Sequence, residues 1–297
     1  MQPNNNDKLT IKKSTFAIIV TVIAVLAILG GGLYYYKGGN ISGLFAYGDS
    51  ETETGTNLEG TKEVVPTDPV TVDITVITAK ECAGCFDLAT AADELKKSPI
   101  LVVRQLSKIL ASSDEAKALI KQYGITKIPT MIMTGDEVDK LPVQGFKKVG
   151  NTLIMEDVPP PYIDLEDKEI KGLTKLTYLV DKTCTQCYDA KQHKEVLEYA
   201  FGIYIANEET KDISSTEGKA LVDKYKITKI PTILLSTEAN DYQMVQTLWD
   251  KLGTKETDGV LVFRNFEMTK DIVYKDLATN KLVNTSQLPA QANTAEE

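Results

Sequence analysis

The four cysteines are the residues whose spacing points most directly to chemistry. They form two Cys-x-x-Cys pairs, Cys82 with Cys85 and Cys184 with Cys187, and leave no cysteine for a long-range structural disulfide. A thiolate in such a pair attacks a disulfide, and the second cysteine then resolves the mixed disulfide. We therefore predict Cys82 and Cys184 as attacking nucleophiles, with Cys85 and Cys187 as the resolving cysteines.

Composition excludes several other kinds of chemistry. The chain has one histidine, His193, so a Cys-His hydrolase repeated in two domains and a His-rich metal site are both disfavoured. We interpret His193 as an ordinary surface residue. The formal net charge of −9 argues against a nucleic-acid partner. No cofactor is predicted.

An internal repeat sets the domain organisation. The first cysteine pair recurs as the second at an offset of 102 residues, and the hexapeptide 125–130 recurs at 227–232 with the same offset. The sequence therefore predicts two copies of one unit.

Each unit alternates apolar, β-branched runs with helix-forming segments. The first cysteine follows a strand and should lie at the N-terminus of a helix, whose dipole favours the thiolate, with Lys80 and Lys182 adding positive potential. The β-α-β-α-β order predicts parallel pairing. The expected strands are 70–77, 100–103 and 131–133 in the first unit and 173–180, 203–205 and 233–235 in the second; the expected helices are 86–97, 113–123, 188–199 and 215–225.

Two further segments complete the expected units. Residues 241–253 of the second unit favour a helix, and 141–150 is interpreted as its shorter counterpart in the first. The prolines 159–161 predict an extended connector that runs to Gly172.

The segment 15–36 has no charged residue, and its 22 residues span about 33 Å as a helix, enough to cross a bilayer. Lys8, Lys12 and Lys13 precede it, so the positive-inside rule places residues 1–14 in the cytoplasm and the rest outside. A cleaved signal peptide is the alternative. We expect a flexible linker at 37–68, domains at 69–171 and 172–288, and a disordered tail at 289–297.

The Cys-x-x-Cys pairs, each followed 47 residues later by Ile-Pro-Thr, resemble the thioredoxin superfamily, and the tandem arrangement is similar to two-domain protein disulfide oxidoreductases. The resemblance implies an α/β fold of two tandem thioredoxin-like domains, each a mixed central sheet flanked by helices, after the membrane helix. It also implies that Pro129 and Pro231 are cis and that Ile128 and Ile230 contact substrate, together with these prolines.

We thus expect a membrane-anchored, extracytoplasmic thiol-disulfide oxidoreductase whose partners are protein thiols and disulfides, the lipid bilayer and a membrane redox partner. The two residues inside each pair, Ala83-Gly84 and Thr185-Gln186, differ from the Gly-Pro of thioredoxin, so the redox direction stays open. Two alternatives remain: a binding or adaptor module without turnover, and a metal-binding protein that uses the four sulfurs.

Overall fold

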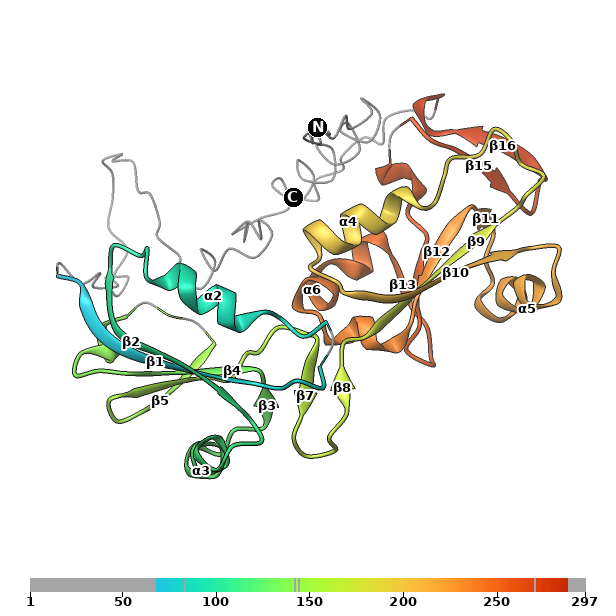
Figure 1. Cartoon of the computed structure of the whole chain (residues 1–297). Helices are drawn as coiled ribbons and strands as arrows, with labels where there is room; N and C mark the ends of the chain where they lie inside the picture. Colours follow the sequence, from blue (N-terminus) through green and yellow to red (C-terminus); the bar gives the residue numbers. More distant parts are fainter. Residues whose placement is uncertain (1–67, 83, 142, 144, 270, 288–297) are drawn as a thin grey trace, which may run out of the picture. The chain divides into compact units, whose positions relative to one another are not determined.

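The computed structural model describes residues 68–82, 84–141, 143, 145–269 and 271–287. These residues divide into two compact units, called here the first unit, which ends at Leu173 and with which Gly202–Tyr204 also cluster, and the second unit, which comprises the remaining residues from Thr174 onward (Figure 1). The predicted N-terminal segment 1–14, membrane helix 15–36 and tail 289–297 lie outside the described residues, as does all but one residue of the linker. Within the described part, no helix is long and apolar enough to cross a membrane.

The first unit is built on a five-stranded mixed sheet in the order β2-β1-β4-β6-β5. The central strand β1 is parallel to β2 and antiparallel to β4, so the expected parallel pairing is confirmed for the first two strands and wrong for the third. Its strands are β1 (Val70–Thr78), β2 (Leu101–Leu110), β4 (Thr130–Thr134), β5 (Phe146–Val149) and β6 (Thr152–Met155).

Alternation along β1 explains why helices cover both faces of this sheet. Val70, Val72, Ile74 and Val76 face one cluster of buried side chains, to which helix α2 (Leu88–Leu95) contributes. Ile77 faces a second cluster, against which helix α3 (Asp114–Tyr123) packs. Figure 1 shows the two helices on opposite sides of the sheet.

The second unit repeats this plan with a sheet in the order β10-β9-β12-β14-β13. Strand β9 is parallel to β10 and antiparallel to β12. Helices α4 (Gln192–Ala200), α5 (Thr216–Tyr225) and α6 (Gln243–Leu252) accompany β9 (Thr174–Val180), β10 (Ile205–Asp212), β12 (Thr232–Leu235), β13 (Gly253–Lys255) and β14 (Leu261–Phe263). Short 3-10 helices lie at Val138–Lys140, Thr237–Asp241, Phe266–Met268 and Thr285–Gln287.

Each unit also carries a small three-stranded sheet that was not predicted from the sequence. The segment before Pro129 forms β3 (Lys127–Ile128), which pairs with a hairpin of β7 (Tyr162–Asp164) and β8 (Ile170–Lys171). The expected extended connector to Gly172 is therefore wrong. In the second unit, β11 (Lys229–Ile230), β15 (Val273–Asp276) and β16 (Lys281–Asn284) form the same arrangement.

Other expected elements are corrected in extent or type. Residues 141–150 are not a helix, because their second half forms strand β5 in a hairpin with β6. The helix expected at 241–253 is present as α6. Strand β10 begins where the expected strand 203–205 ends, and β2 runs seven residues beyond 103, to Leu110.

The helices α3 and α5 begin as their sequence signals predict. The hydroxyl of Ser113 accepts a hydrogen bond from the backbone N–H of Ala116, and Ser215 accepts one from Gly218. A Cβ on Gly218 would lie 1.9 Å from the backbone oxygen of Asp212, so glycine lets α5 approach β10 closely. The first unit has Ala116 at the corresponding position, fully buried.

We expect Gly218→Ala to destabilise the second unit by about 2 kcal/mol, although alanine is the better helix former, because the backbone of Asp212 must move. Urea unfolding followed by the fluorescence of Trp249 measures this, since the only tryptophan of the chain lies in α6. Ala116→Gly in the first unit is the control and should leave that transition unchanged. A Gly218→Ala variant as stable as the parent would contradict the close helix-to-strand packing.

Candidate functional site

Each Cys-x-x-Cys pair lies on a loop that follows the central strand of its unit. Disulfide bonds join Cys82 to Cys85 and Cys184 to Cys187, with Cα–Cα distances of 5.4 and 5.5 Å. All four cysteines are partly accessible to solvent. Both pairs thus satisfy the geometry that a reversible dithiol requires, whereas their roles as nucleophile and resolving cysteine stay predictions.

The cysteines do not lie at helix N-termini, contrary to our expectation. Helix α2 begins at Leu88 and α4 at Gln192, several residues after the second cysteine of each pair. The effect of a helix dipole falls off within its first turn, so the dipole contributes little to either attacking thiolate. The stability of each attacking thiolate therefore depends more on the charged side chains near its loop. Lys80 and Lys182 are exposed, and so is Glu81.

The predicted substrate-contact residues lie on the segments that precede β4 and β12. The Ile128–Pro129 and Ile230–Pro231 peptide bonds are both cis, as the resemblance implied. The backbones of Ile128 and Ile230 pair with β7 and β15 of the same chain. Their contact with substrate stays a prediction, and a substrate strand that used this backbone edge would replace that pairing.

The hairpins are also bonded to the cysteine loops. The residue after the second cysteine donates its backbone N–H to the segment where the hairpin begins: Phe86 to the oxygen of Pro161 at 3.4 Å, and Tyr188 to that of Val273 at 2.8 Å. Cysteine loop, proline segment and hairpin therefore form one connected structure in each unit.

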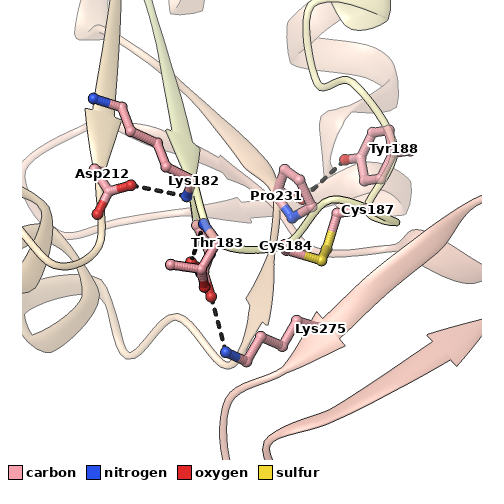
Figure 2. The surroundings of a disulfide bond; sticks show 9 residues. Lys182, Thr183, Cys184, Cys187, Tyr188, Asp212, Pro231 and Lys275 are labelled. Carbon is pink, nitrogen blue, oxygen red and sulfur yellow. Dashed lines mark hydrogen bonds and ion pairs between the residues drawn. A yellow bond between two sulfur atoms is a disulfide. The ribbon is translucent and has the colours of Figure 1, made fainter.

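In the second unit a carboxylate organises the turn that leads to Cys184. The backbone N–H of Cys184 donates to the backbone oxygen of Asp181 at 3.0 Å. The Asp181 side chain accepts bonds from the N–H and hydroxyl of Thr183 at 2.9 and 2.5 Å, and from the ammonium of Lys275 at 2.8 Å (Figure 2). Lys275 and then Thr183 hold the pKa of this carboxyl below its usual range. Its side chain is 7% exposed and that of Lys275 21%.

A second carboxylate supports the same turn. Asp212, at the end of β10, accepts a hydrogen bond from the backbone N–H of Lys182 at 2.8 Å (Figure 2). It also accepts bonds from the N–H and hydroxyl of Ser214, which keep the pKa of the Asp212 carboxyl low. The backbone just before Cys184 is thus fixed from two sides.

The Tyr188 hydroxyl connects the proline segment to helix α4: it donates to the backbone oxygen of Pro231 at 2.9 Å and lies 3.1 Å from Nε2 of His193. Because the hydroxyl proton is used on Pro231, we assign Nε2 of His193 as the donor to Tyr188. The His193 ring packs between Tyr188 and Phe263, so its interpretation as an ordinary surface residue is wrong. Desolvation lowers the pKa of His193 to about 4.

The first unit carries apolar residues where the second has these polar groups. At the offset of 102 residues, Ala79 corresponds to Asp181 and Leu110 to Asp212. Phe86 likewise corresponds to Tyr188, and Ala91 to His193. Asp181, Asp212, Tyr188 and Lys275 were not predicted as site residues. At the offset of 102 residues, Asp181, Asp212 and Tyr188 stand out because their counterparts in the first unit are apolar, whereas Lys275 lies beyond the segments that repeat at this offset.

Within the described residues, no group of three or more His, Cys, Asp or Glu side chains is arranged to hold a metal ion.

No family model matches the chain, and no curated protein matches it. Among solved structures, it is similar to a domain of alkylhydroperoxide reductase AhpF from Enterococcus faecalis, with 16% identity, coverage of 56% of this chain and 82% of that one, and a TM-score of 0.19. A protein disulfide oxidoreductase from Aeropyrum pernix shares 15% identity over 57% of this chain and 77% of that one, with a TM-score of 0.16. Human ERp44 shares 10% over 63% and 50%, with a TM-score of 0.18. The likeness concerns the fold alone.

We expect His193 to make the second unit less stable in mild acid. The folded unit keeps His193 neutral with a pKa of about 4, while the unfolded chain protonates it near 6.5, so its contribution is complete above pH 6.5 and is lost as the pH falls towards 4. The loss should be about 2 kcal/mol, allowing for the partly accessible ring. Urea unfolding of the parent and of His193→Gln, followed by Trp249 fluorescence from pH 7.5 to 4.5, measures it. Equal pH profiles would contradict a neutral His193 ring packed between Tyr188 and Phe263.

Proposed function

We propose that the chain is a thiol-disulfide oxidoreductase that acts on protein dithiols and disulfides through both Cys-x-x-Cys pairs. The observation that carries the proposal is that each repeated unit holds its pair as a disulfide on a partly accessible loop after the central strand. A module that only binds its partner has no need of the second cysteine, and this chain keeps it in both copies.

The reaction is two successive thiol-disulfide exchanges. In the reducing direction, the thiolate of Cys184 attacks a substrate disulfide; one sulfur–sulfur bond breaks, a mixed disulfide forms, and the released substrate thiolate takes up a proton. The thiolate of Cys187 then attacks the sulfur of Cys184 and releases the second substrate thiol. The enzyme is now a disulfide, and two electrons have passed to the substrate. Cys82 and Cys85 perform the same steps in the first unit. The reverse sequence oxidises a protein dithiol.

The location follows from the segment 15–36, which we propose as a membrane anchor that leaves both units outside the cytoplasm, where disulfides persist. The full-length chain should then stay with the membrane fraction after washing in alkaline carbonate. A chain that starts at Pro69 should be released. Release of the full-length chain would contradict the anchor.

The direct test of the activity equilibrates the full-length chain with glutathione buffers and reads each pair by alkylation and mass spectrometry. We expect a reversible two-electron transition at both pairs. Pairs that never exchange would contradict the proposal and leave a binding module.

The assigned roles predict which variants trap substrate. With a disulfide-bonded protein as substrate for the reduced enzyme, Cys85→Ser and Cys187→Ser should accumulate mixed disulfides at Cys82 and Cys184, because no resolving thiol remains. Cys82→Ser and Cys184→Ser are the matched controls and should trap little. Stronger trapping by these controls would reverse the assignment.

A further inference from the structure

The two cysteine loops differ at one partly buried contact. In the second unit, Asp181 forms an ion pair with Lys275, which lies opposite Ile230 in the pairing of β11 with β15. The residue opposite Ile128 in the first unit is Ile163. Since Ala79 corresponds to Asp181, the first unit has an alanine and an isoleucine where the second has two charges, and both pack against the same apolar cluster.

The ion pair is held on the turn that ends at the attacking cysteine of the second pair. The bond from the N–H of Cys184 to the oxygen of Asp181 closes a four-residue turn, whose ends are less than about 7 Å apart between Cα atoms. The bond from the N–H of Thr183 to the Asp181 side chain fixes the same turn. At such a separation in a partly buried loop, one uncompensated charge changes the stability of a thiolate considerably.

Besides the ion pair, the turn itself carries Lys182 and is contacted by Asp212. Lys182 on the turn is exposed. Asp212 from β10 is engaged by Lys182 and Ser214, and Lys275 comes from β15. No helix N-terminus lies at Cys184, and the Asp181–Lys275 pair, with side chains 7% and 21% exposed, supplies partly buried charge on the turn that leads to it.

We infer that Asp181 and Lys275 are positioning residues that set the thiolate stability of Cys184, and so give the second cysteine pair a redox equilibrium of its own. The inference rests on the proposed function. In the Asp181–Lys275 ion pair, the carboxylate disfavours the Cys184 thiolate and the ammonium favours it, so the two effects oppose each other while the ion pair fixes the turn. The first unit has no ion pair at the corresponding positions, which are Ala79 and Ile163.

The inference predicts opposite effects for the two charge-removing variants. Asp181→Asn keeps an oxygen to accept the bond from Thr183 but leaves Lys275 unbalanced, so the Cys184 thiolate should be favoured. Lys275→Met keeps the packing of the side-chain stem but leaves Asp181 unbalanced, so the thiolate should be disfavoured. A purely structural role would instead disturb the turn in the same sense in both variants.

The experiment measures the alkylation rate of Cys184 by iodoacetamide in the reduced full-length chain at pH 6, where the rate follows the thiolate fraction. We expect Asp181→Asn to react about three- to tenfold faster than the parent and Lys275→Met about three- to tenfold slower. In glutathione buffers, the dithiol-to-disulfide ratio of the second pair should rise for Asp181→Asn and fall for Lys275→Met. A tenfold change corresponds to about 30 mV.

Three controls keep the result interpretable. The alkylation of Cys82, followed by mass spectrometry in the same samples, should proceed at the parent rate in every variant. Lys275→Arg keeps the charge and should stay within about twofold of the parent, and the double variant should lie between the two single ones. Trp249 fluorescence shows whether each variant is folded. If one single variant is unfolded, the double variant is compared with the remaining single variant instead.

The outcomes separate this inference from the proposed function. Changes in the same direction, or no change at Cys184 in folded variants, overturn the charge-balancing role whatever the pairs do with glutathione. If neither pair of the parent exchanges with glutathione, the proposed function fails, while the alkylation rates still decide whether Asp181 and Lys275 control the thiol.

Discussion

Backbone hydrogen bonding along both edges of the central strands β1 and β9 determines where each cysteine loop begins. Because β4 runs antiparallel to β1, its first residue, Thr130, lies opposite Ile77 near the end of β1. The same register places Thr232 opposite Leu179. The prolines just before β4 and β12 are thereby brought to the end of the sheet at which the cysteine loops leave it. A shift of one residue in either pairing would move these side chains to the other face of the sheet.

The repeat made the fold largely predictable, but strand direction and the short hairpins were not. Apolar alternation locates β1, β4 and their counterparts, and Ser113 and Ser215 mark the starts of two helices. The pattern is the same for a strand in either direction, so it cannot distinguish the antiparallel β4 from a parallel strand. Strands of two to four residues, such as β3, β8 and β16, are too short to leave a period in the sequence.

The cysteines could be found from spacing alone, whereas the groups that control them could not. Asp181 is visible in the sequence only as a difference from Ala79. Lys275 escapes even that comparison: 102 residues after Ile163 stands Asn265, and only the pairing of β15 with β11 makes Lys275 its counterpart. The prediction for His193 was wrong because a lone histidine on a polar helix gives no sign that the ring of Phe263, from strand β14, packs against it.

Substrate binding and sulfur chemistry are connected through the hairpins, and differently in the two units. A substrate strand that paired with Ile230 would compete with β15, and β15 carries the lysine bound to Asp181 beside Cys184. Displacing β15 would therefore also remove the ammonium from the cysteine loop. In the first unit the corresponding Ile163 brings only an apolar contact, and Ala79 stands where Asp181 would be, so displacing β7 would break no ion pair at that position. The two copies of one fold thus differ in whether occupation of the proline segment breaks an ion pair on the turn that leads to the first cysteine.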